Sequence, residues 1–222
     1  MCYVIYMKSS SHNQESKRPY RWPMRQRQAE ETRQRILAVA RALLTTQGYV
    51  SMTMEAIAEA AEVSPKTVAA VVGSKREILA ELVNPDAFDA PIQELLSQLR
   101  TGQEPEQRVK LVVFITRRVY ASLRSEFELL RTAGVVDPEL ADLALRIEAR
   151  RRHNQSYLIT DLHERGRLRP NLSPEEALDI LWSLTGYDLY RMLVIECGWE
   201  AEHYEHWLSQ LLLDRLLQYE AQ

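Results

Sequence analysis

The stretch Thr53-Met-Glu-Ala-Ile-Ala-Glu-Ala-Ala-Glu-Val-Ser-Pro-Lys-Thr-Val-Ala-Ala-Val-Val72 decides the fold. It contains two signals for the start of a helix. Thr53 is a hydroxyl N-cap, and Ser64 is a second one, followed at once by Pro65, which is favoured at the first helical position. The spacing predicts two short helices on either side of the tight turn 61–64, an arrangement typical of a helix-turn-helix.

The flanking residues extend this motif to a domain. Apolar residues recur at helical spacing upstream of Gly48, a residue that suits the end of a helix. Downstream, Ser74-Lys-Arg-Glu77 has the sequence of a capping box that opens a further helix. In such a domain the second helix of the motif protrudes into the DNA major groove, which is about 12 Å wide. The predicted DNA-binding domain spans 29–84, with its motif at 53–72 and its core helices at 30–46, 53–61 and 65–72.

The first 28 residues lack an apolar period. They contain Ser9-Ser10-Ser11, two prolines and scattered basic residues, so we expect 1–28 to be a disordered basic extension. Met24, directly before the helical pattern, offers an alternative start to Met1. The basic residues of this arm have two interpretations, an arm that enters a minor groove or a solvated tail; they are Lys17, Arg18, Arg21, Arg25 and Arg27.

Every segment after Asn84-Pro85 has a helical pattern. The expected helices are 87–100, 106–132, 137–165, 174–197 with a kink or break at Gly186, and 201–219. We therefore predict an all-α fold, in which an N-terminal three-helix helix-turn-helix domain precedes a larger C-terminal helical domain over 85–222.

Composition restricts the classes of function. Unbroken apolar runs such as 111–115 are far shorter than the roughly 18 residues of a membrane span, so no membrane partner is expected. Two cysteines cannot build a disulfide framework, and the N-terminus does not resemble a signal peptide, so the expected location is cytoplasmic. Residues 1–85 carry 12 Lys/Arg and 8 Asp/Glu, whereas 86–222 carry 16 and 23. This asymmetry favours a polyanionic partner for the N-terminal part.

The sequence lacks the motifs of an enzyme. No Gly-rich phosphate loop, nucleophile elbow or HExxH motif is present. His203 and His206 lie one helical turn apart, but no further ligands complete a metal site around them. We expect no catalytic residues, no metal and no cofactor.

Several motifs carry a resemblance to a known family. They are Thr32-Arg-Gln-Arg-Ile-Leu37, Gly48-Tyr49, Thr53-Met-Glu-Ala-Ile-Ala58, Ala60-Ala-Glu-Val-Ser64, Thr67-Val68 and Gly73-Ser-Lys-Arg-Glu-Ile-Leu79. In this order they resemble the N-terminal domain of the tetracycline-repressor (TetR) family of transcriptional regulators. The resemblance implies a homodimeric repressor, a palindromic double-stranded DNA operator, and a C-terminal pocket for a small-molecule effector of unknown identity that releases the DNA.

The resemblance also implies roles for single residues. Thr53 and Lys75 would contact phosphates, and Lys66 and Thr67 would lie in the groove; the full set of candidate DNA-binding residues is Thr53, Ser64, Pro65, Lys66, Thr67, Ala70 and Lys75. Two features depart from the family pattern. Glu62 replaces the usual small turn residue, which requires a relaxed or left-handed backbone, and 69–72 lacks the usual aromatics. The alternative function is a helical sensor or interaction protein with a degenerate DNA-binding head.

Two further sets belong to the C-terminal domain. Candidates for the effector pocket are Phe114, Tyr120, Tyr157 and Trp182, and their alternative role is ordinary core packing. Candidates for a dimer interface between the last two helices and their symmetry mates are Leu181, Leu208, Leu211 and Leu212. Their alternative role is closure of the monomer's own core.

Overall fold

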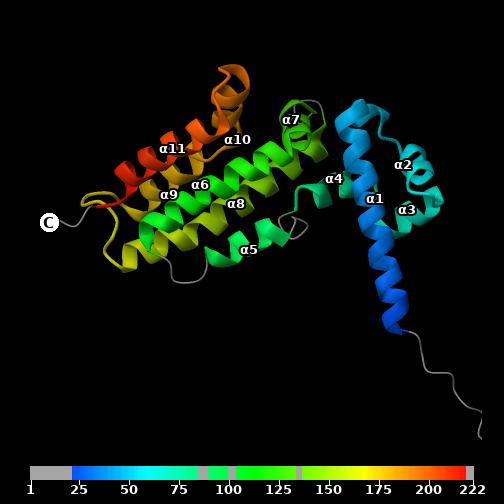
Figure 1. The fold of residues 1–222 in the computed structure, drawn as a ribbon, viewed down its shortest axis with the longest axis horizontal. Helices are drawn as coiled ribbons and strands as arrows, with labels where there is room; N and C mark the ends of the chain where they lie inside the picture. Colours follow the sequence, from blue (N-terminus) through cyan, green and yellow to red (C-terminus); the bar gives the residue numbers. More distant parts are fainter. Residues whose placement is uncertain (1–21, 85–89, 100–103, 134–136, 219–222) are drawn as a thin grey trace, which may run out of the picture.

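The computed structural model describes residues 22–84, 90–99, 104–133 and 137–218, and its fold is all-α, as predicted. The only β pairing among these residues is one antiparallel bridge between Leu168 and Leu217. Figure 1 shows two regions, a small head formed by residues 22–82 and a longer helical bundle formed by residues 90–217.

The head contains the predicted helix-turn-helix. Its helices are α1 (Trp22–Ser51), α2 (Met54–Ala60), α3 (Pro65–Val72) and α4 (Lys75–Leu82). Side chains cap three of the four starts as predicted. The hydroxyl oxygen of Thr53 accepts from the N–H of Ala56, that of Ser64 accepts from Thr67, and Ser74 forms a complete capping box with Glu77.

Helix α1 is longer than predicted. The sequence placed 22–28 in a disordered extension, whereas the helix begins at Trp22; the rest of that extension lies outside the described residues. Polar contacts one turn apart support the helix here, because Arg27 Nε lies 3.0 Å from Glu31 Oε1 and this region has no apolar face. The first turns of α1 project past the rest of the head in Figure 1. Gly48 has φ 78° and marks a kink, after which the helix continues to Ser51.

The bundle holds the remaining helices. They are α5 (Ala90–Gln98), α6 (Pro105–Ser122), α7 (Arg124–Ala133), α8 (Pro138–Glu164), α9 (Pro174–Leu184), α10 (Tyr187–Tyr190), a π-helical segment over Arg191–Glu196, and α11 (Ala201–Leu216). The expected break at Gly186 is present, since this glycine precedes α10 in an extended conformation. Within the apolar run 111–115, Val112, Val113 and Ile115 are buried, whereas Leu111 and Phe114 are half-buried.

The predicted helix 106–132 is two helices. The chain leaves helical geometry at Leu123, which has φ −116° and ψ 30°, and α7 then takes a new direction towards the head. No glycine or proline marks this bend in the sequence. Packing is the physical reason, because Leu123 is buried in the bundle while the next helix contacts α1.

Two apolar cores lie along the molecule. The core of the bundle joins α6, α8, α9 and α11. The core of the head continues beyond α4, because Leu130 of α7 and Leu140 and Leu143 of α8 pack into it. The head therefore does not close its core within 29–84, and it shares apolar contacts with the end of the bundle.

Candidate nucleic-acid interface and effector cleft

A left-handed residue forms the turn between α2 and α3. Glu62 has φ 55°, which confirms the left-handed alternative for this departure from the family pattern. The turn is closed by a hydrogen bond in which the N–H of Val63 donates to the carbonyl oxygen of Ala58, 3.0 Å away. This geometry leaves the N-terminal end of α3 at the surface of the head.

Helix α3 has one buried and one exposed side. Val68 and Val72 pack into the core of the head. The exposed side carries Ser64, Pro65, Lys66, Ala69 and Ala70, and Thr67 is half-buried. Lys66 is thus the one cationic side chain on α3, and the two alanines give its exposed side little hydrogen-bonding capacity.

Two of the hydroxyls that cap helices in the head are exposed to solvent. Thr53 and Ser64 are exposed, and each uses its oxygen to accept a backbone hydrogen bond of 3.0 Å. The hydroxyls of Ser64 and Thr67 also share a hydrogen bond of 2.8 Å. A hydroxyl that accepts at its oxygen still has a hydrogen to donate, so Thr53 retains a donor for a phosphate.

Lys75 has contacts within the head. Its ammonium lies 4.0 Å from the ring centroid of Tyr49, and it donates to the carbonyl oxygen of Val50 at 3.4 Å. Partial burial lowers the pKa of this lysine. The ammonium is therefore positioned beside the start of α4 by an aromatic ring, a contact that sequence reasoning missed although Tyr49 stood in the motif Gly48-Tyr49.

Arg33 is a second residue that sequence reasoning missed. Its guanidinium donates to the carbonyl oxygen of Val71 at 3.1 Å and forms a 2.6 Å ion pair with Glu81. It therefore links the end of α3 to α1 and α4. The pairing partners are 38 and 48 residues away in the chain, so spacing alone gave no signal for it.

Charged side chains join the head to the bundle. Glu126 of α7 is 1% exposed and lies 3.4 Å from Arg41 of α1, which also donates to the carbonyl oxygen of Leu82. Burial raises the pKa of Glu126, while Arg41 acts in the opposite direction. Arg76 of α4 forms ion pairs of 3.2 Å with Asp137 and 2.7 Å with Glu139, at the start of α8.

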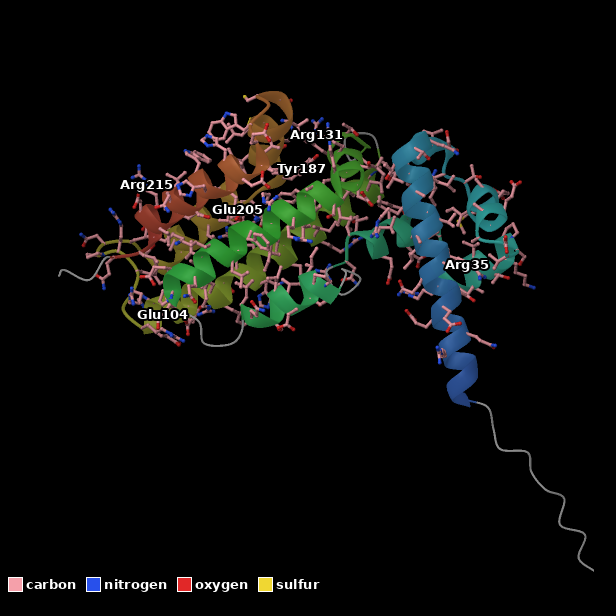
Figure 2. The ribbon with its side chains drawn as sticks, viewed as in Figure 1. Arg35, Glu104, Arg131, Tyr187, Glu205 and Arg215 are labelled. Atoms are coloured by element: carbon pink, nitrogen blue, oxygen red, sulfur yellow. The ribbon has the colours of Figure 1, made fainter. Side chains whose placement is uncertain are left out.

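A cleft of about 410 Å³ lies in the bundle close to this junction. Phe127 and Tyr187 stack in its wall with ring centroids 5.2 Å apart. Other lining residues are Leu130, Ile147, Arg151 and Trp182. Figure 2 labels Tyr187 and Arg131 at the end of the bundle that faces the head. The cleft and the head thus share α7, since Leu130 belongs to both.

The structure separates the four predicted pocket residues. Trp182 lines the cleft, and its indole N–H donates to Glu148 at 2.9 Å. Tyr120 is fully buried behind the cleft, with its ring 4.9 Å from that of Phe127. Phe114 lies under the guanidinium groups of Arg117 and Arg118 and is not part of the cleft. Tyr157 is 62% exposed on α8 and is not part of the cleft.

The structure also separates the four predicted interface leucines. Leu181, Leu208 and Leu212 are completely buried within one chain, where they form the core of the bundle. They follow the alternative weighed from the sequence, closure of the monomer's own core. Only Leu211 of this set is half-buried and reaches the surface of α11.

The described residues include neither a membrane-spanning helix nor a metal-binding cluster. None of these helices combines the length and apolar character of a transmembrane segment. The same part of the chain holds no cluster of three or more His, Cys, Asp or Glu side chains suited to a metal ion.

Comparison with known proteins agrees with the geometry of the head. The profile of the family described as bacterial regulatory proteins, tetR family, matches residues 36–82. The uncharacterized HTH-type transcriptional regulator YdeS of Bacillus subtilis is 27% identical over 166 residues, which cover 74% of this chain and 80% of YdeS.

Solved structures share the fold of nearly the whole chain. A protein from Saccharomonospora viridis, in complex with choline, superposes with a TM-score of 0.67 at 19% identity and covers 86% of this chain and 100% of its own. The complex of SmeT with triclosan gives a TM-score of 0.69 at 19% identity, over 86% of this chain and 93% of its own. With the helix-turn-helix in place and the profile matched over the head, residues 36–82 form a DNA-binding domain of the tetR family of bacterial regulatory proteins, and the solved structures share the fold of the rest of the chain.

Proposed function

We propose that this chain is a cytoplasmic, ligand-responsive transcriptional repressor that acts as a homodimer on a palindromic operator. The observation that carries the proposal is the exposed N-terminal end of α3, where Lys66 stands beside the hydroxyls of Ser64 and Thr67. Backbone N–H groups at a helix start and flanking hydroxyls suit phosphate oxygens, and a lysine suits a phosphate or a guanine edge.

The dimer contact is proposed on the outer side of α9 and α11. Trp207 and Leu211 are half-buried and lie four residues apart on α11, and Ile180 and Leu184 do so on α9. Residues four apart share one face of a helix, so each helix has an apolar stripe at the surface of the bundle. Pairing these stripes across a two-fold axis would set the separation of the two heads.

The effector is proposed to bind in the cleft beside α7. Two proteins of the same fold are solved with a small molecule, choline in one and triclosan in the other. In this chain, α7 contributes Phe127 and Leu130 to the cleft and Glu126 to the ion pair with Arg41 of the head. A ligand that favours a different position of α7 would therefore change the angle of the head and the population that fits the operator.

The phosphate contacts can be tested by the salt dependence of DNA binding. Lys66→Ala and Lys75→Ala should each weaken binding to DNA from upstream of the gene and reduce the slope of log K against log salt by about one. Lys110→Ala removes the same charge from an exposed site on α6 and should leave the slope unchanged. Equal slopes in all four proteins would contradict the assignment of the head as the DNA contact.

One observation favours a second candidate function, a sensor with a degenerate head. Ala69 and Ala70 are exposed where a reading helix usually presents larger side chains. A gel-shift with upstream DNA at low salt distinguishes the two functions. Absence of binding at micromolar protein favours the degenerate head.

A further inference from the structure

Two buried polar atoms of the bundle have no partner among the described residues. Gln155 of α8 is 8% exposed and Tyr204 of α11 is 0% exposed. Among the described residues, neither Gln155 Oε1 nor the Tyr204 hydroxyl has a hydrogen-bond partner. A buried acceptor and a buried hydroxyl without partners are unfavourable in a folded protein, so each requires an explanation, and a bound ligand or water is one.

Thr185 connects Gln155 to the wall of the cleft. Its Oγ1 accepts from Arg151 at 2.9 Å and from Gln155 Nε2 at 2.8 Å, and it donates to the carbonyl oxygen of Leu181. Arg151 itself lines the cleft. The Gln155 amide therefore lies directly behind the cleft wall, because the Thr185 hydroxyl connects it by hydrogen bonds to the lining residue Arg151.

Tyrosine rings extend this buried region to α11. Tyr120 donates its hydroxyl to the carbonyl oxygen of Thr185 at 3.0 Å, and its ring lies 5.7 Å from that of Tyr190, which in turn lies 5.5 Å from Tyr204. Burial raises the pKa of Tyr120 and of Tyr204, and the charge of Arg151 acts on both in the opposite direction. The aromatic cluster thus runs from the Tyr120 hydroxyl at Thr185 to the ring of Tyr204 on α11.

The charges around the cleft are already paired. Glu148 accepts from Arg151 at 2.6 Å and from the Trp182 indole, and Glu128 accepts from Arg131 at 3.0 Å and from the Tyr187 hydroxyl. An anionic or cationic ligand would have to break one of these ion pairs before it gained a partner. A neutral ligand can form hydrogen bonds with Gln155 Oε1 and the Tyr204 hydroxyl without breaking an ion pair.

We propose, as a deeper reading of the effector site above, that the cleft continues past Arg151 to Gln155 and Tyr204 and that it takes a small neutral phenol. The ring packs edge-to-face among the tyrosines, as these rings already do with one another. The phenol hydroxyl donates to Gln155 Oε1 and accepts from the Tyr204 hydroxyl, which satisfies both atoms. This inference rests on the assignment of the cleft as the effector site.

Calorimetric titration of the full chain tests the inference, with 4-methylphenol as the probe. Its ether 4-methylanisole keeps the ring but has no hydrogen to donate, and 4-methylbenzoate adds a charge. We expect 4-methylphenol to bind at least about tenfold more tightly than either, since one buried hydrogen bond is worth about that factor. Equal binding of the phenol and the ether, or no binding of the phenol at millimolar concentration, overturns the proposal.

Two variants identify the site. Tyr204→Phe removes a hydroxyl that has no partner, so the fold is expected to persist while the affinity for 4-methylphenol falls about tenfold. Gln155→Leu removes the acceptor and should have a similar effect. Tyr157→Phe makes the same change at an exposed position and should leave the affinity unchanged. Wild-type affinity in both buried variants overturns the assignment.

DNA binding of the same preparations separates this inference from the proposed function. If the unliganded chain binds upstream DNA but 4-methylphenol does not bind, the phenol site is wrong and the regulator stands. If 4-methylphenol binds with the expected preference but the chain does not bind DNA, the site stands and the repressor function is wrong.

Discussion

The head and the bundle are both helical, but different interactions define where their helices begin and bend. In the head, Thr53, Ser64 and Ser74 each cap a helix from within the same short segment. In the bundle, α8 and α9 also begin at side-chain caps, but α6 and α11 do not, and the bend at Leu123 depends on packing against distant helices. Local signals thus define the helix-turn-helix of the head, whereas the bundle combines local caps with boundaries that depend on tertiary contacts.

The largest expected loss in the free energy of unfolding follows a substitution in the core of the bundle. Leu208→Ala should lower the free energy of unfolding by about 2–5 kcal/mol, because it leaves a cavity where a fully buried leucine was. Denaturant unfolding followed by tryptophan fluorescence measures this change, since Trp182, Trp199 and Trp207 all lie in the bundle. Leu211→Ala is the control and should cost clearly less. Equal losses in both variants would contradict the assignment of Leu208 to the core and Leu211 to the surface.

A smaller effect is expected for a cap in the head. Ser64→Ala removes the acceptor for the Thr67 N–H and should lower stability by about 1 kcal/mol. Thermal unfolding followed by circular dichroism reports it. Ser97→Ala, inside α5, removes a serine that caps no helix and is expected to change little. If both substitutions have the same effect, the local capping account of the head is not supported.

The smallest effect is expected at the junction between the two regions, and it depends on pH. Burial raises the pKa of Glu126 in the folded protein, so stability is lost as the pH rises from the unfolded value of about 4.3 through the folded value. Glu126→Gln has no charge to bury and should be the more stable protein at pH 7, with the difference shrinking towards pH 4.

The partner of Glu126 provides the control. Arg41→Met removes the cation that offsets part of the burial, so its loss of stability with rising pH should exceed that of the wild type. Unfolding midpoints measured across this pH range check both variants. A difference between Glu126→Gln and wild type that is constant with pH would show that titration of Glu126 is not its cause.

The success of sequence reasoning depends on how local each signal is. The helix-turn-helix was predicted, and the left-handed Glu62 and the break before α10 were each one of two predicted alternatives, because each depends on residues next to it in the chain. The early start of α1 was missed, since alternating Arg, Gln and Glu side chains stabilise a helix without an apolar face. The bend at Leu123 was missed because no helix-breaking residue causes it.

The candidate sites were predicted unevenly for the same physical reason. Of the pocket candidates, Trp182 lies in the cleft, but Tyr157 and Phe114 do not, because an aromatic residue at helical spacing does not reveal which helix it will face. The apolar period of α11 likewise could not distinguish Leu208, which faces its own core, from Leu211 at the surface. Gln155 and Glu126 carried no sequence signal, since only tertiary packing buries them.

The most direct test of the central proposal is a footprint of the purified chain on the DNA upstream of its own gene. A dimer with two reading helices should protect a dyad-symmetric region whose half-sites lie about one helical turn, roughly 34–36 Å, apart. Protection should appear at protein concentrations well below the micromolar range of non-specific binding. Protection of one half-site alone, or none below about 1 μM, would contradict a dimeric repressor that reads DNA through α3.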